Sequence, residues 1–93
     1  MNDALNGLQG YRAEVLRIAA TYGASNVRVV GPAPDGDGDL DLLIDMYPDR
    51  SLFDLVDLGR ELSELLGRRV DVLAAATLSP RLRDDVFAEA RPL

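Results

Sequence analysis

Apolar residues recur at helical spacing near the start of the chain and predict a first helix from about Ala4 to Tyr22. Gly23 follows this segment and is suited to cap its carboxyl end. The apolar positions of the predicted helix are Leu5, Leu8, Val15, Ile18 and Ala19. A β-branched run over residues 27–30 then predicts a short strand.

A second strand is predicted from Asp39 to Met46, where the side chains alternate between two faces. Leu40, Leu42, Ile44 and Met46 share one face, and Asp39, Asp41, Leu43 and Asp45 share the other. A third strand is predicted over Arg69–Ala74, with Asp71 on the face opposite Val70 and Val72. The alternation therefore places Asp39 and Asp41 together on one strand.

Two further helices have clear start signals. Ser51 and Asp54 have the spacing of a capping box, with aspartate in place of the usual glutamate, and the apolar stripe that follows runs to Gly67. Ser79 and Pro80 open a last helix that is predicted to reach about Ala90. We expect Leu52, Phe53, Val56, Val86 and Phe87 to belong to the core, whereas an excess of such residues on the surface would mark a partner site.

The predicted order is α-β-β-α-β-α, which indicates an α/β (α+β) fold with a small mixed sheet flanked by helices. A chain of 93 residues suits a single domain, here residues 1–93. No apolar run approaches the roughly 20 residues of a membrane span, and no leader pattern is visible, so we expect a cytoplasmic protein with no membrane partner. The oligomeric state stays open.

The charge and composition narrow the chemistry. The net charge of −6 argues against non-specific binding of nucleic acid. The chain has no cysteine and no histidine, which excludes thiolate or imidazole zinc sites and histidine-dependent nucleophilic catalysis. Carboxylates remain as the carriers of metal chemistry.

Asp39 and Asp41 lie roughly 7 Å apart along the predicted strand, and Asp71 on a neighbouring strand would add a third carboxylate to the same face. Such an oxygen-rich cluster suits Mg²⁺ that also binds substrate phosphates, with room for two ions. Without a cation, the three groups would raise one another's pKa values. The alternative interpretation is that these aspartates line a solvated face.

The chain from about Tyr22 to Leu93 resembles the minimal nucleotidyltransferases of the DNA polymerase β superfamily, which often serve as antitoxins in prokaryotic toxin–antitoxin pairs. The similarity rests on YGASNVRVVG, DGDLDLLIDM, RSLFDLVDLGRELSELLGRRVDVL and LSPRLRDDVFAEARPL. It implies a nucleotidyltransferase fold in which Asp39 and Asp41 bind metal, Asp71 is the third acidic position, and Gly31 belongs to the phosphate-binding turn. The implied activity is Mg²⁺-dependent transfer of AMP from ATP to a hydroxyl of a HEPN-type toxin.

The phosphate loop departs from the pattern of this family. Pro32 stands where the resemblance implies a serine, and proline offers a phosphate neither a hydroxyl nor a backbone N–H. Gly36 and Gly38 would let the loop approach a phosphate, although glycines between aspartates also suit a plain turn. The sequence therefore leaves three functions open: catalysed transfer, neutralisation of a partner by binding alone, or a subunit of a larger transferase whose phosphate loop is supplied by another chain.

Overall fold

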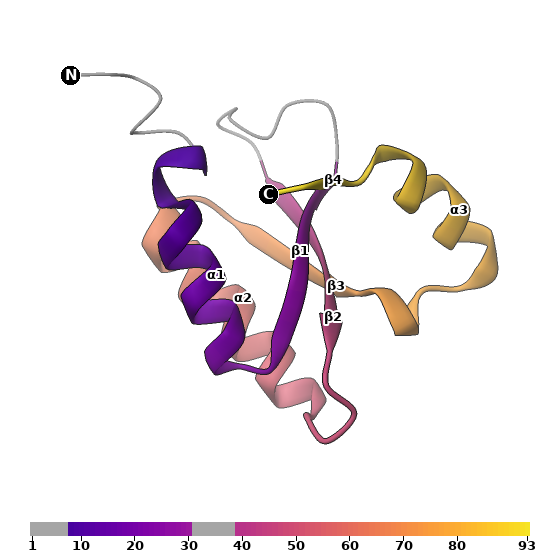
Figure 1. Ribbon diagram of the computed structural model, residues 1–93, viewed down its shortest axis with the longest axis horizontal. Helices are drawn as coiled ribbons and strands as arrows, with labels where there is room; N and C mark the ends of the chain where they lie inside the picture. Colours follow the sequence, from indigo (N-terminus) through magenta and orange to yellow (C-terminus); the bar gives the residue numbers. More distant parts are fainter. Residues whose placement is uncertain (1–7, 31–38) are drawn as a thin grey trace.

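The computed structural model describes residues 8–30 and 39–93, which form a four-stranded mixed sheet with helices on both faces (Figure 1). The strands lie in the order β3-β2-β1-β4. Strand β1 is antiparallel to both β2 and β4, and β2 is parallel to β3. The strands are β1 (Ala24–Val30), β2 (Leu40–Met46), β3 (Val70–Ala74) and β4 (Arg91–Pro92). The predicted mixed sheet is confirmed, and β4 is an addition to it.

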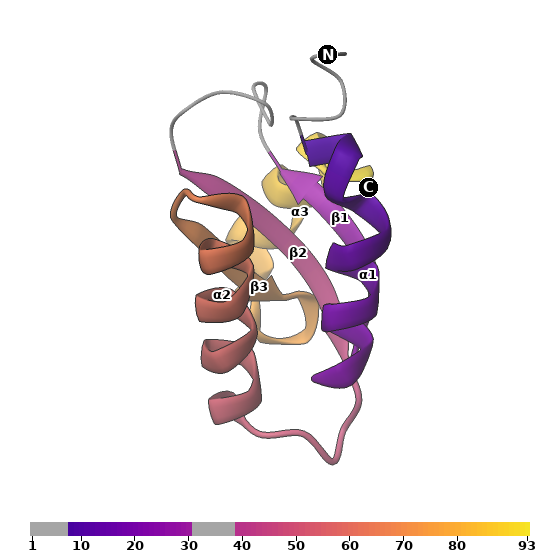
Figure 2. The ribbon, with the colours of Figure 1, turned by 90° about the vertical axis from the view of Figure 1, so that its left-hand side faces the viewer.

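The α-helices are divided between the two faces of the sheet. Helices α1 and α2 lie side by side on one face, and α3 lies on the other, as Figures 1 and 2 show from two directions. The helical segments are η2 (Leu8–Tyr11), α1 (Arg12–Thr21), α2 (Leu52–Leu66), η3 (Ala75–Thr77) and α3 (Pro80–Glu89). Within the part of the chain that the structure describes, no helix is long and apolar enough to cross a membrane.

The boundaries follow the local signals in the sequence. The capping box of α2 is present, since the Ser51 backbone N–H donates to Asp54 Oδ2 at 3.0 Å, and Gly67 ends the helix with a φ of 65°. The first helix is partly different from the prediction, because its α-helical part begins only at Arg12, after a 3-10 turn that contains Gly10. Glycine has poor helix propensity, which accounts for the late start. Residues 4–7 of that prediction lie outside the described residues.

The main core lies between the sheet and the pair α1 and α2. Leu40, Leu42 and Ile44 are fully buried, as the alternation along β2 predicts. Val15 from α1 and the α2 leucines Leu58 and Leu62 also belong to this core. Leu43 is also fully buried although it shares the opposite face with the aspartates. That face of β2 is therefore part apolar and part acidic.

Three residues that were expected in the core are exposed instead. Leu52, Phe53 and Val56 of α2 have exposed fractions of 72%, 80% and 60%. Helix α2 buries Leu58 and Leu62 and packs Leu55, Leu65 and Leu66 against the core. A helix presents only one arc of its surface to a sheet, so the apolar positions outside that arc remain in solvent.

The apolar residues of α3 are also less buried than expected. Val86 is half-buried, and Phe87 is exposed, with its ring 5.4 Å from the Arg28 guanidinium and 5.0 Å from that of Arg83. Helix α3 has no fully buried residue. The contact between Phe87 and Arg28 of β1 therefore contributes to holding α3 beside the sheet, whereas Arg83 and Phe87 both belong to α3.

Gly23 makes the tight turn from α1 into β1. Its φ is +79°, and an added Cβ would lie only 2.5 Å from Cγ of Arg50. Its carbonyl accepts a hydrogen bond from the Tyr47 N–H at 3.0 Å. This turn joins the end of α1 to the segment that leaves β2.

Candidate functional site

Asp41 and Asp71 are direct neighbours on adjacent strands. Strands β2 and β3 run parallel, and their register pairs Asp41 with Asp71. Paired residues of a parallel ladder point to the same face, and neighbouring strands lie about 4.8 Å apart. The Leu40 N–H donates to the Arg69 carbonyl at 2.9 Å and fixes the start of this pairing. The two aspartates that the sequence assigned to different strands are therefore brought side by side.

Asp39 stands at the entrance to β2, two residues before Asp41, and is exposed. Burial raises the pKa of the Asp41 carboxyl above its ordinary value, and the negative charges of Asp71 and then Asp39 raise it further. The positive charge of Arg69 acts in the opposite direction. All three predicted acidic residues therefore interact electrostatically at one end of the β2–β3 pair.

Asp71 already has a cationic partner within the chain. Arg69 Nε lies 3.4 Å from Asp71 Oδ1, and the two side chains are 71% and 42% exposed. An ion pair this exposed is weak, worth about 0.2–1 kcal/mol. A divalent cation could therefore displace Arg69 from Asp71 at little cost.

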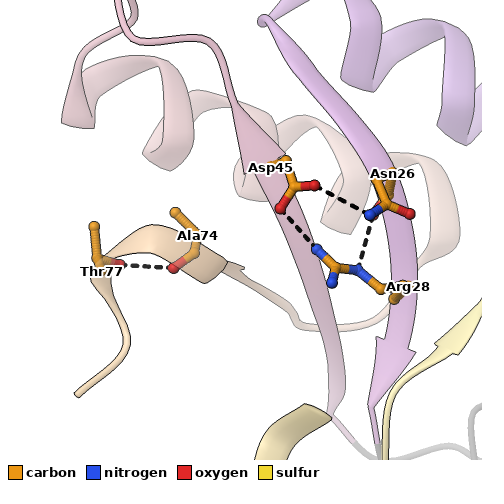
Figure 3. Close-up of polar contacts among 5 residues, drawn as sticks. All are labelled: Asn26, Arg28, Asp45, Ala74 and Thr77. Carbon is orange, nitrogen blue, oxygen red and sulfur yellow. Dashed lines mark hydrogen bonds and ion pairs between the residues drawn. The ribbon is translucent and has the colours of Figure 1, made fainter. Parts of the chain in front are cut away.

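Asp45, the next carboxylate along this face of β2, is engaged in a different network (Figure 3). Arg28 Nη2 donates to Asp45 Oδ1 at 2.9 Å, and Asn26 Nδ2 donates to Asp45 Oδ2 at 3.0 Å. Arg28 Nε also donates to the Asn26 carbonyl at 3.0 Å. These bonds hold Asp45 away from the other aspartates, so it serves the packing of β1 against β2.

This network was not foreseen from the sequence. Asn26 has a φ of 51°, and the pairing of β1 with β2 is irregular between Ser25 and Arg28. The irregularity brings Asn26 and Arg28 to the same carboxylate. Asparagine in a strand is a signal for such a bulge, because it tolerates left-handed backbone better than most residues.

A separate hydrogen bond in Figure 3 shapes the end of β3. The Thr77 hydroxyl donates to the Ala74 carbonyl at 2.8 Å. It closes the 3-10 turn η3, where the chain leaves the sheet toward α3. The turn therefore separates α3 from the strand that carries Asp71.

The donor set suits a hard divalent cation. Carboxylate oxygens from adjacent strands are ligands that Mg²⁺ accepts, and such ions usually retain waters or substrate oxygens as further ligands. Across residues 8–30 and 39–93, no three acidic side chains converge as a ready-made ligand group. The preformed part is the Asp41–Asp71 pair, and Asp39 is the exposed neighbour that would have to turn toward it.

The predicted phosphate loop cannot be placed beside this pair. Gly31, Gly36 and Gly38 lie outside the described residues, as does Pro32. Their contact with a nucleotide phosphate stays a prediction from the sequence.

Comparisons with known proteins agree with this arrangement. No protein-family profile matches the chain. A Methanocaldococcus jannaschii protein, provisionally named a protein adenylyltransferase, is 31% identical over 83 residues, which cover 85% of this chain and 89% of that protein. A solved structure provisionally described as a minimal nucleotidyltransferase is 43% identical, with a TM-score of 0.80 and coverage of 92% of each chain.

A more distant structure shares the fold. It is described as the tri-AMPylated Shewanella oneidensis HEPN toxin in complex with MNT antitoxin, and it contains a chain that matches with a TM-score of 0.73 at 14% identity. The match covers 90% of this chain and 69% of that one. The family assignment rests on relatives that match nearly the full length of the chain, and the fold and the in-register carboxylate pair agree with it. This chain belongs to the minimal nucleotidyltransferase family.

Proposed function

We propose that this protein transfers AMP from ATP to a hydroxyl group of a partner protein, using Mg²⁺ held by Asp39, Asp41 and Asp71. The observation that carries the proposal is the pairing of Asp41 with Asp71 on one face of the sheet, with Asp39 close enough to influence the charge of Asp41. Clustered carboxylates repel one another, and a bound cation gives them a physical reason to be together.

The transfer breaks one P–O bond and forms another. The acceptor hydroxyl oxygen attacks the α-phosphorus of ATP, and pyrophosphate leaves with the electrons of the broken bond. When bound, Mg²⁺ neutralises the phosphate charge and orients the triphosphate. Asp41 would hold the ion from β2, an inner strand of the sheet, and Asp39 would do so from the entrance of the same strand.

Asp71 serves either as the third ligand or as the base that accepts the hydroxyl proton. It lies on the edge strand β3 with a half-exposed carboxylate, which an acceptor from another protein can reach. Arg69, its partner in the free protein, would be released toward the pyrophosphate. That phosphate would replace the carboxylate as a charged hydrogen-bond acceptor.

Two similar proteins support a proposal for the chemistry of the partner. One relative is provisionally named a protein adenylyltransferase, and the fold also occurs beside an AMPylated HEPN toxin. We therefore propose that the acceptor is a HEPN-type toxin, that this protein acts as its antitoxin, and that both act in the cytoplasm. A bulky anionic AMP group on a toxin hydroxyl would block its surface both sterically and by charge.

The first test is calorimetric titration of the protein with ATP in the presence and absence of Mg²⁺. We expect Mg²⁺-dependent binding in the wild type and a loss of binding in Asp41→Asn. Asp45→Asn is the matched control, because Asp45 lies on the same strand but pairs with Arg28. No Mg²⁺-dependent heat in the wild type would reject nucleotide transfer and favour a protein that neutralises its partner by contact alone.

The second test uses ATP labelled at the α-phosphate, incubated with Mg²⁺ and the HEPN-type partner. We expect the label on the partner, and no label with Asp39→Ala combined with Asp41→Ala. Nucleotide binding without labelling, alongside an active related pair as control, would contradict the transfer. The same double variant should keep the wild-type fold, since neither side chain belongs to the hydrophobic core.

A further inference from the structure

Helix α2 contacts β3 immediately before Asp71 in the chain, through one serine hydroxyl. The Val70 N–H donates a hydrogen bond to Ser63 Oγ at 2.9 Å, and the Ser63 hydroxyl donates in turn to the Gly59 carbonyl at 2.7 Å. The Ser63 proton is committed to its own helix, so the oxygen is left to act as an acceptor for Val70. Two linked hydrogen bonds thus connect the middle of α2 to the residue before Asp71.

The peptide group between Arg69 and Val70 is held from both sides. Its carbonyl oxygen, from Arg69, accepts from the Leu40 N–H of β2 at 2.9 Å, and its N–H, from Val70, donates to Ser63 of α2. The carbonyl and the N–H of a planar trans peptide point in opposite directions, so this one peptide links β2 to α2. Rotation of the peptide would break at least one of the two bonds. The start of β3 is therefore fixed against the strand and against the helix at once.

Strand β3 depends on such a contact because it is an outer strand of the sheet. It has five residues and, in the sheet that the structure describes, pairs with β2 alone. An edge strand presents unpaired N–H groups on its outer side, and Val70 supplies the first of them in β3. Ser63 accepts from that group. Asp71 is the next residue, and its place beside Asp41 follows from the register of the strand.

Two residues of α2 that face Val70 are poor choices for the interior of a helix. Gly59 has low helix propensity, and a serine bonded to the carbonyl four residues earlier slightly destabilises a helix. A Cβ at position 59 would lie 3.4 Å from the Val70 carbonyl oxygen and 3.6 Å from Cγ2 of Val72, so glycine lets the helix backbone approach β3 closely. Residues that break a local rule are expected where they serve a functional site. The unfavourable pair therefore indicates a role in placing β3.

We propose that Ser63 is a positioning residue of the metal site: through the Arg69–Val70 peptide, its hydroxyl holds Asp71 level with Asp41. This inference rests on the proposed function, because it takes both aspartates as Mg²⁺ ligands. Ser63 is not itself a ligand, since its hydroxyl already donates one hydrogen bond and accepts another. Without the hydroxyl, the start of β3 is held on one side only and can shift relative to β2. Mg²⁺ requires near-ideal ligand geometry, so such a shift weakens its binding.

Calorimetric titration with ATP at a fixed Mg²⁺ concentration measures the effect. Ser63→Ala should bind ATP about 10-fold more weakly than the wild type, the lower end of the range for residues that support a metal ligand. Ser63→Thr should restore most of the affinity, because a threonine hydroxyl can also bond to the carbonyl four residues earlier. Each variant is titrated well below its unfolding temperature, so that loss of folded protein does not contribute.

Two controls separate positioning from stability. Val15→Ala truncates a fully buried side chain of α1 and should lower the stability of the domain without weakening ATP binding. Thr21→Val removes a hydroxyl that donates to the Arg17 carbonyl at 3.1 Å, a bond of the same spacing on α1, and should also bind like the wild type. A Ser63→Ala variant with wild-type affinity would overturn the proposal. So would a Val15→Ala variant that loses as much affinity as Ser63→Ala, because general destabilisation would then explain both.

Amide hydrogen exchange, followed by NMR with a chelator present, tests the same contact without metal. In Ser63→Ala, the exchange of β3 amides relative to β2 amides should be about 5-fold faster than in the wild type, the effect of one hydrogen bond of typical net strength. Equal acceleration of both strands would contradict the proposal, since the hydroxyl would then stabilise only the domain as a whole. A wild type without Mg²⁺-dependent ATP binding would reject the proposed function alone. The exchange comparison would then decide whether Ser63 fixes Asp71 beside Asp41.

Discussion

Replacing Asp41 with asparagine should make the free protein more stable while removing its proposed metal site. The substitution keeps the size and shape of the side chain and removes one negative charge. In the folded protein that charge is partly buried and lies beside Asp71 and Asp39, which is why the pKa of Asp41 is raised. The free protein therefore loses stability when Asp41 ionises.

The size of the effect follows from the geometry of the strands. Two unit charges about 5 Å apart, the spacing of neighbouring strands, repel by roughly 0.8 kcal/mol in water. Asp71 is half-exposed and paired with Arg69, so screening reduces this to about 0.5 kcal/mol. For a domain of this size, such a change raises Tm by about 2–4 °C.

Thermal unfolding followed by circular dichroism, with a chelator present and over a range of pH, measures the difference. Because its pKa is raised, the folded state holds the Asp41 proton more tightly than the unfolded chain does. The resulting stabilisation is complete below the ordinary value of 3.8 and is lost as the pH rises through the folded pKa. The advantage of Asp41→Asn should therefore be absent at acidic pH and constant near neutrality.

Asp45→Asn, a substitution on the same strand, should instead make the protein less stable. It breaks the 2.9 Å ion pair with Arg28 and should lower the free energy of unfolding by about 0.5–1 kcal/mol. An Asp41→Asn variant that is less stable than the wild type at neutral pH would refute the reasoning. A stability gain that persists unchanged at acidic pH would refute it as well, because charge repulsion would then not be its cause.

Three further substitutions test how the fold positions the site. Ser63→Ala removes the hydroxyl that accepts from the Val70 N–H at 2.9 Å and should cost about 1–2 kcal/mol in urea unfolding; a neutral result would show that water replaces the hydroxyl. Gly23→Ala forces a side chain into left-handed backbone and against Arg50, so we expect a loss of more than about 1 kcal/mol and a lower Tm. Leu43→Ala empties a fully buried site beside the aspartates and should cost about 2–5 kcal/mol by chemical denaturation; a loss below 1 kcal/mol would mean that this face is loosely packed.

Much of the fold was predictable because local signals and periodicity agree in this chain. The alternation from Asp39 to Met46 and the capping box at Ser51 both specify their elements without help from distant residues. Strand β4 was missed because two residues carry no periodicity, and this strand exists only through its pairing with β1. The exposed positions of α2 were misjudged because a helical stripe does not reveal how wide a face the rest of the protein covers.

The site was predictable in its residue types and only partly in its geometry. Spacing alone places Asp39 and Asp41 on one face, but the register that sets Asp71 beside Asp41 depends on how β3 docks, which the sequence does not encode locally. The separate role of Asp45 depends on the bulge at Asn26, which brings Arg28 within reach. Long-range pairing therefore decides which of the four carboxylates act together.

The position of β2 inside the sheet determines when the backbone around Asp41 unfolds. This strand is hydrogen-bonded on both sides, to β1 and to β3, and its leucines are fully buried. Amide protons in such a strand exchange with solvent only when the whole domain unfolds. The backbone that carries Asp41 should therefore keep its shape through partial openings that release α3 or the sheet edges. Asp71 lies on the edge strand β3, so an early loss of the proposed metal binding on heating should come from the opening of β3 and not of β2.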